Sequence, residues 1–235
     1  MTVCWHFDDL KVSHANATKV TKSGEWLNTT YVVSVVSHRG KVHNYLGMIL
    51  DFSCDGKVII NMMEYISSII TAFPEEISGF RATPAADHLF DVRDPQDACP
   101  LPEEQARTFH HTVAQLLLLS ACARCDIQRV TAFLTTCVKA PDKDDWGKVK
   151  RLLQYLKCTV HMPLILSAES LALACVWVDT AYAVHTNCRS HTGAGMSLGH
   201  GMAMSYSWKQ KINTKSSTEA KLVGVDHSLG HILWA

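Results

Sequence analysis

The N-terminal part of the chain alternates between apolar and polar positions, which predicts a hairpin followed by a helix. Residues 1–12 alternate up to an acidic tip at Asp8 and Asp9, so we expect two strands with both carboxylates exposed at a tight turn. A helix is expected over residues 16–31, with a polar N-cap and with Trp26 and its neighbour Leu27 on the inner side.

The next stretch, residues 31–62, predicts further β-structure. A first apolar run covers residues 32–36, and Asp55-Gly56 separates two later apolar runs, which is a strong signal for a hairpin. A short helix with one apolar face is expected over residues 63–73.

The character of the chain changes at residues 74–104, which hold five of the seven prolines and many acidic residues. We interpret this stretch as a linker. Three amphipathic helices are then expected, over residues 103–123, 126–139 and 142–157.

Short apolar runs return in the last third of the chain. A strand over residues 171–178 is expected to end at Asp179, and further strands are expected over residues 193–198 and 203–208. Ser216 or Ser217 is expected to open a final helix. This order of elements predicts an α+β protein with two partial domains.

Composition narrows the class of protein. The chain has 235 residues, of which 47% are hydrophobic and 19% charged, enough for a core and unlike a disordered or fibrous chain. Its 22 basic and 22 acidic residues give no net charge, so only local basic patches can favour nucleic acid. No apolar run is long enough to span a membrane, we see no secretory signal, and nine scattered cysteines suit a reducing compartment.

Two carboxylate pairs are candidates for metal-dependent chemistry. Asp8 and Asp9 lie together at the hairpin tip, where a pair of Mg²⁺ ions would offset their repulsion, although Asp-Asp is also an ordinary turn dipeptide. A strand-end Asp179 and a helical Glu219 can share a divalent ion. The alternatives are a turn residue at Asp179 and a favourable helix-dipole interaction at Glu219.

Basic residues form two groups that suit a phosphate backbone, although a solvated helix face explains them equally well. One lies on and near the helix at 142–157 and the other surrounds the last strand, where Tyr206 and Trp208 are interleaved. The candidate binding residues are Lys148, Lys150, Arg151, Lys209, Lys211 and Lys215. The pair Cys122 and Cys125 is weak evidence for a metal or redox site, because no second pair accompanies it.

Taken in order, these segments resemble the polymerase region of copia-type retrotransposon polyproteins over nearly the whole chain. Residues 5–10 (Trp-His-Phe-Asp-Asp-Leu) are similar to the reverse transcriptase active-site hairpin, and residues 45–48 to the hairpin that grips the primer. Residues 123–127 and 151–159 are similar to two later helical motifs. The most specific similarity is Thr-Lys-Ser-Ser-Thr-Glu-Ala at residues 214–220, the ribonuclease H step that carries a catalytic carboxylate.

The resemblance implies a partial reverse transcriptase palm and thumb at 1–73, a linker at 74–104, a helical connection at 105–165, and a truncated ribonuclease H-like α/β domain at 166–235. It implies Mg²⁺ or Mn²⁺ as cofactor. The metal ligands and catalytic residues would be Asp8, Asp9, Asp179 and Glu219, and the primer-binding residues Tyr45, Leu46 and Gly47. We therefore expect Asp179 and Glu219 to converge.

The implied partners are an RNA template, a DNA primer, an RNA–DNA hybrid and the remaining polyprotein segments upstream and downstream, with no membrane. The implied location is cytoplasmic, in virus-like particles of an active element. Phe7, Cys125 and Cys158 depart from the family's pattern. Further carboxylates of both sites are expected beyond this chain, so we expect an inactive fragment of a reverse transcriptase and ribonuclease H. The alternative is a non-catalytic remnant that binds nucleic acid.

Overall fold

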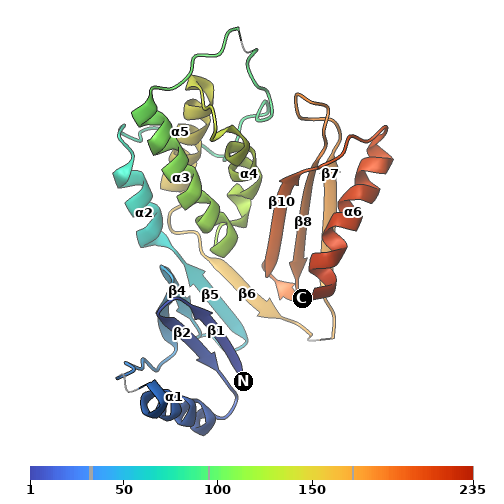
Figure 1. The fold of residues 1–235 in the computed structure, drawn as a ribbon. Coiled ribbons are helices and arrows are strands. Elements are labelled where there is room, and N and C mark those ends of the chain that lie inside the picture. The colour runs from blue at the N-terminus through green and yellow to red at the C-terminus, as the bar shows by residue number, and fades with distance from the viewer. Residues whose placement is uncertain (32–33, 95, 171, 235) are drawn as a thin grey trace.

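The structure is a computed structural model that describes residues 1–31, 34–94, 96–170 and 172–234. It is a mixed α/β protein with a small N-terminal hairpin, a five-stranded sheet, a helical core and a three-stranded sheet, all of whose paired strands are antiparallel (Figure 1). The α+β class is confirmed at this level. Within the described ranges, no helix combines the length and apolar character needed to cross a bilayer.

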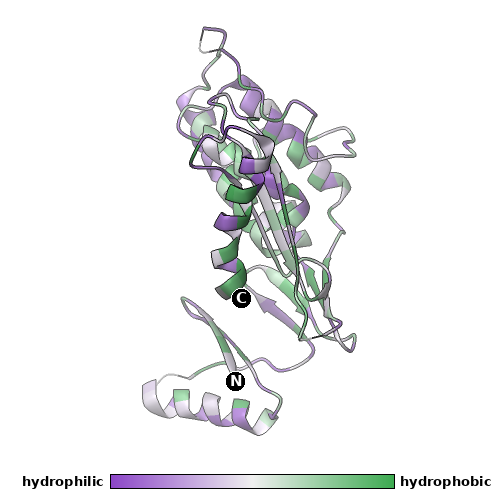
Figure 2. Ribbon diagram, turned by 90° about the vertical axis from the view of Figure 1, so that its right-hand side faces the viewer, coloured by the Kyte–Doolittle hydropathy of each residue, from purple (hydrophilic) through white to green (hydrophobic). Residues whose placement is uncertain are grey.

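The N-terminal unit follows the predicted pattern but buries little. Strands β1 (Thr2–His6) and β2 (Asp9–Ser13) form the hairpin, and α1 (Ala17–Tyr31) follows. The Asn16 side-chain oxygen accepts the backbone N–H of Thr18 at 2.9 Å, so Asn16 caps α1 as expected. The inward position predicted for Trp26 is wrong, because this side chain is 58% exposed. The reason is that α1 lies at the foot of the molecule, away from the other helices (Figure 2).

The five-stranded sheet joins segments from three parts of the chain. Its order is β3 (Val42–Tyr45), β4 (Met48–Asp51), β5 (Lys57–Asn61), β6 (Leu164–Ala168) and β9 (Gly199–His200). Strand β6 was not predicted, and it begins inside the expected helical connection. The run expected at 32–36 falls partly on residues 32–33, outside the described residues, and residues 35–36 form no strand.

The helical core is built from α2 (Met63–Ala72), α3 (Glu103–Cys122), the 3₁₀ turn η1 (Cys125–Ile127), α4 (Gln128–Cys137) and α5 (Lys143–Cys158). These helices agree with the predicted ones to within a few residues. Asp142 and Asp145 form a capping box at the start of α5. Leucine, valine and phenylalanine side chains from α3, α4 and α5 are fully buried against one another, and their burial is the main source of stability.

Residues 74–104 hold no helix before α3 and, among those described, no strand beyond a single bridge from Pro100 to Asp142. They nevertheless pack onto the helices, because Ile77, Leu89 and Leu101 are buried in the same core. Whether this segment separates two domains stays a prediction.

The three-stranded sheet has the order β10 (Met204–Lys209), β8 (His191–Ser197) and β7 (Cys175–Ala181). Helix α6 (Ser217–Trp234) packs against β7 and β8, whereas α4 packs against β10 (Figure 1). The predicted end of β7 at Asp179 is wrong, since the strand continues to Ala181.

Candidate nucleic-acid interface

The acidic hairpin presents both of its carboxylates to solvent. Strands β1 and β2 pair down to His6 opposite Asp9, so Phe7 and Asp8 form the turn. Phe7 has a positive φ of 45°, and the indole N–H of Trp5 donates to its carbonyl oxygen at 2.6 Å. Asp8 and Asp9 are exposed, so the predicted position at a tight tip is confirmed. Two adjacent carboxylates in open solvent are accessible to a cation.

A second hairpin carries the residues expected to contact a primer. Tyr45 pairs with Met48, and Leu46 and Gly47 form a two-residue turn with positive φ angles of 52° and 76°. Positive φ at both central positions is the mark of a type I′ turn, whose twist matches that of the flanking strands. The hairpin is therefore a fixed part of the five-stranded sheet.

The two hairpins lie next to each other. Burial raises the pKa of the Tyr45 phenol, and electrostatic interactions with Cys4 and Asp9 of the acidic hairpin raise it further. The Lys11 ammonium lies 5.2 Å from the centre of the Phe52 ring, a second contact between the acidic hairpin and the sheet. Residues that are far apart in sequence are thus brought together, while their roles in metal and primer binding stay predictions.

The basic face of α5 turns toward other protein segments. Lys148 donates to the backbone carbonyl oxygen of Asp91 at 2.8 Å and also pairs with Asp144 of its own helix at 2.9 Å. Lys150 pairs with Glu75 at 2.7 Å. Arg151 donates to a threonine hydroxyl of the preceding segment at 3.0 Å. Because these side chains are engaged, they do not form the open surface that a long nucleic-acid backbone needs.

Asp179 lies on the face of its sheet that α6 does not cover. On α6, a Cβ added at Gly224 would lie 2.6 Å from the Thr180 hydroxyl oxygen, so Thr180 points toward α6. Side chains alternate along a strand, which places Asp179 on the opposite face, beside Gly193 of β8.

Glu219 forms hydrogen bonds that stabilise the N-terminus of α6. Its carboxylate accepts the backbone N–H of Lys215 at 2.6 Å, and its own backbone N–H donates to the Ser216 hydroxyl at 3.2 Å. The helix-terminus alternative is therefore the arrangement that the structure contains. The expected convergence of Asp179 and Glu219 is wrong, because α6 lies behind the face opposite to Asp179. Across the described ranges, no three or more His, Cys, Asp or Glu side chains gather into a group that could hold a metal ion.

The basic group around β10 is only partly accessible. Burial, together with the nearby charge of Arg189, lowers the pKa of Lys209, whereas Lys211 and Lys215 are exposed. One face of the Tyr206 ring is occupied, because it stacks on His231 of α6 with ring centres 4.6 Å apart. Only the two exposed lysines of this group remain as candidates for a phosphate backbone.

The surroundings of the paired cysteines disfavour ionisation of their thiols. Cys122 and Cys125 are free thiols, and burial raises the pKa of both. A raised pKa disfavours the thiolate, which is the form that binds metals and attacks disulfides.

The sequence does not mark a row of hydrogen-bonded polar side chains on the three-stranded sheet. The Ser207 hydroxyl lies 2.7 Å from Nε2 of His191, and Nδ1 of His191 lies 3.0 Å from Nε2 of His185. Burial lowers the pKa of each imidazole to about 4. No local pattern marks these residues, because tertiary packing alone brings them together.

The sequence also does not mark two arginines that share a pocket with α5. Arg81 and Arg93 lie in the proline-rich segment, where isolated basic residues carry no periodic signal. Only the folded chain groups them with Lys143 and Arg151.

Comparisons with known proteins point to one origin. No family model matches the chain, and no solved structure does. A transposon Ty5-1 protein of Saccharomyces cerevisiae is 24% identical over 201 residues, which cover 82% of this chain and 62% of that protein. The retrovirus-related Pol polyprotein from transposon TNT 1-94 of Nicotiana tabacum is 24% identical over 202 residues, which cover 83% of this chain and 15% of the polyprotein. The chain thus spans less than two thirds of either relative, and its similarity to both supports a protein derived from a retrotransposon Pol polyprotein.

Proposed function

We propose that the chain is a portion of a reverse transcriptase and ribonuclease H region, in which the two N-terminal hairpins supply part of a polymerase site. The observation that carries the proposal is the contact between the acidic hairpin and the sheet that contains the Tyr45 hairpin, in which the Lys11 ammonium lies 5.2 Å from the centre of the Phe52 ring. In this proposal Asp8 and Asp9 hold Mg²⁺ or Mn²⁺ beside a primer end gripped by residues 45–47. A bound divalent ion would stabilise the charge that develops on the transferred phosphate.

The same geometry supports a polymerase site that is incomplete without further polyprotein segments. Both carboxylates stand in open solvent, where they attract an ion weakly. Two metal ions held in line with a phosphate need further carboxylates on a facing element. Such an element would approach the exposed hairpin tip.

A second surface, on helix α6, supports a contact with a further polyprotein segment. Leu222, Val225, Leu229 and Leu233 occupy one stripe of α6 and are between 46% and 78% exposed. Figure 2 shows this helix as one of the most apolar parts of the molecule. Exposing an apolar stripe of this kind to water costs free energy, so we propose that a downstream polyprotein segment covers it.

The ribonuclease H half is proposed to be inactive in this chain. Its order of three antiparallel strands followed by a helix fits the proposed assignment. Its two carboxylates, however, lie on different faces, so cleavage of an RNA–DNA hybrid would need a rearrangement of α6. We therefore expect this chain not to cleave an RNA–DNA hybrid.

The polymerase proposal is tested by restoring the missing element. The purified chain alone should not extend a DNA primer on an RNA template with Mg²⁺ or Mn²⁺. A fusion to the part of the Ty5-1 relative that lies outside the matched region, which covers 62% of that protein, should extend it. In the fusion, Asp9→Asn should abolish extension, while Asp55→Asn, which alters another exposed turn aspartate, should not. A fusion that folds but extends no primer, or extension that is insensitive to Asp9→Asn, would overturn the proposal.

The second candidate is a non-catalytic remnant that binds nucleic acid, and the exposure of Lys211 and Lys215 favours it. Fluorescence anisotropy with a labelled RNA–DNA hybrid should then show weak binding that falls steeply with salt. Replacing both lysines by alanine should weaken it and flatten the salt dependence. Lys22→Ala on the remote helix α1 is the matched control. Binding unchanged by the double replacement would exclude this surface.

A further inference from the structure

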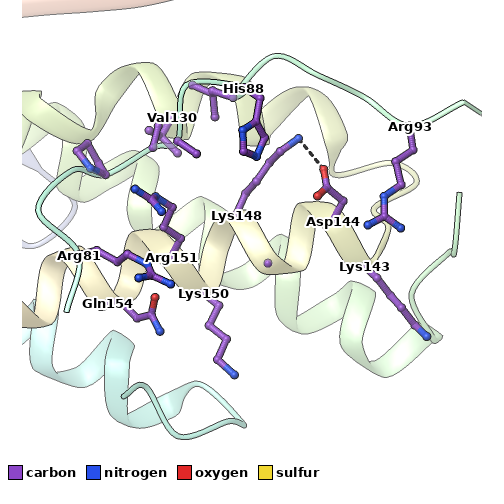
Figure 3. Close-up of a pocket in the computed structure, with 15 residues that line it drawn as sticks. Arg81, His88, Arg93, Val130, Lys143, Asp144, Lys148, Lys150, Arg151 and Gln154 are labelled. Atoms are coloured by element: carbon purple, nitrogen blue, oxygen red, sulfur yellow. Dashed lines mark ion pairs between the residues drawn. The ribbon is translucent and has the colours of Figure 1, made fainter. Parts of the chain in front are cut away.

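The helical core contains a pocket that none of the functions discussed above uses. It has a volume of about 390 Å³ and lies between α5 and the segment that contains residues 81–93, with Val130 of α4 in its wall. Figure 3 shows Arg93 and Lys143 at one end, Arg81 and Gln154 at the other, and Lys148 with His88 between them. Residues from three parts of the chain thus form one concave site.

The pocket is strongly basic. Six of its lining residues are cationic and a single one is acidic, Asp144. The cationic residues are Arg81, Arg93, Lys143, Lys148, Lys150 and Arg151. Lys148 and Lys150 have carboxylate partners, and among the described residues the other four form no ion pair. Four like charges that are not neutralised repel one another, and an anion placed between them would remove that cost.

One donor in the pocket lacks an acceptor. Nε of Arg151 is buried and has no hydrogen-bond partner within the described part of the chain. A buried donor without a partner costs free energy that an acceptor would recover. The guanidinium group offers planar, paired donors, which suit the oxygens of a phosphate better than a lone halide ion.

We propose that this pocket binds a small ligand with two or more linked phosphate groups. Lys143 and Gln154 are three helical turns apart on α5, about 16 Å along its axis, so a single phosphate can contact only part of the lining, whereas linked phosphates can contact more of it. We favour a small ligand over a nucleic-acid strand because the pocket is bounded by α5, by the segment at residues 81–93 and by Val130 of α4. The inference is independent of the proposed polymerase role, since the pocket contains neither N-terminal hairpin.

The pocket offers a matched pair of variants that differ in charge alone. Gly147 of α5 lines the pocket, and a Cβ added there would meet no atom within 4 Å. Gly147→Gln and Gly147→Glu therefore place side chains of equal size in the same space. The introduced carboxylate should repel a polyphosphate, whereas the amide should not.

Isothermal titration calorimetry of the full chain with inorganic tripolyphosphate tests the proposal. We expect saturable binding of one ligand, at least tenfold weaker binding of orthophosphate, and at least tenfold weaker binding of tripolyphosphate by Gly147→Glu than by Gly147→Gln. Arg93→Ala with Lys143→Ala should also weaken binding at least tenfold, and Lys22→Ala should leave it unchanged. Circular dichroism confirms that each variant is folded.

Three results would overturn the proposal. The first is no saturable binding of tripolyphosphate by the folded wild type. The second is an equal loss for Lys22→Ala and for the Arg93 and Lys143 pair, which would indicate nonspecific charge attraction. The third is a twelve-nucleotide single strand that binds more tightly than tripolyphosphate and is weakened by Gly147→Glu, which would make the pocket a strand-binding site.

Discussion

Replacing Asp126 by asparagine should destabilise the helical core strongly, because it leaves a buried guanidinium without its counter-charge. The Arg124 side chain is only 1% exposed. Its Nε and Nη2 donate to the two carboxylate oxygens of Asp126 at 2.9 and 2.8 Å, and it also donates to Thr159. The Tyr155 hydroxyl donates to Asp126 at 2.7 Å. The carboxylate therefore accepts three hydrogen bonds from two neighbours.

The size of the effect follows from this geometry. Breaking a buried ion pair by removing one partner costs about 3–5 kcal/mol. Asp126 is 27% exposed, so water can partly replace its charge and the lower end, about 3 kcal/mol, is expected. Burial by itself would raise the pKa of Asp126, but the hydrogen bonds and charge of Arg124 outweigh it and lower the pKa. The carboxylate is thus ionised at neutral pH, and the asparagine removes a full charge.

Urea unfolding followed by far-ultraviolet circular dichroism measures the loss. The midpoint should fall for Asp126→Asn with an unchanged slope. The double variant Arg124→Met with Asp126→Asn should be more stable than Asp126→Asn, because it no longer buries an unpaired charge. A loss below about 1 kcal/mol for Asp126→Asn, or a double variant less stable than the single one, would refute the reasoning.

Three further predictions concern other regions. The pKa values of His185 and His191 are lowered to about 4, so the unfolded chain binds more protons than the folded one as the pH falls from 6.5 to 4. The free energy of unfolding, measured by urea titration, should therefore be greatest above pH 6.5 and should decline through this window. A free energy of unfolding that does not change with pH in this range would contradict the prediction. Gly147→Ala should raise the free energy of unfolding by about 0.5–1 kcal/mol, because its Cβ meets no atom and alanine favours the helix; a lower urea midpoint would count against this. Asp9→Asn should leave the thermal midpoint unchanged, because Asp9 is exposed; a clear shift would show a structural role.

The helices could be predicted from the sequence because their signals are local. Trp146, Val149 and Leu153 repeat at helical spacing on α5 and are buried, and Asp142 supplies the cap immediately before it. The acidic turn was predicted for the same reason, since both of its strands lie within a few residues of it.

The failures share a physical cause, which is dependence on distant partners. Strand β6 is short, and its apolar residues become a strand because β5 offers a free edge. The sequence pattern predicts that Trp26 lies on the inner face of an amphipathic helix, yet none of the described helices and strands buries its side chain. In the candidate site, both hairpins could be predicted from the types of residue at their turns. The side of the sheet on which Asp179 lies could not, because it depends on how α6 packs against β7.

The pairing of β5 with β6 ties together two strands that stand on either side of the helical core in the sequence. Closing such a long loop is entropically costly, so this pairing is expected to form late and to limit the folding rate. During synthesis, β5 leaves the ribosome long before β6, so the edge of β5 that will pair with β6 stays unpaired in the meantime. An exposed strand edge can pair with another chain, so the nascent chain is most prone to aggregation in this interval. Rapid docking of α2 to α5 would shorten the interval by holding β5 beside the place that β6 will occupy.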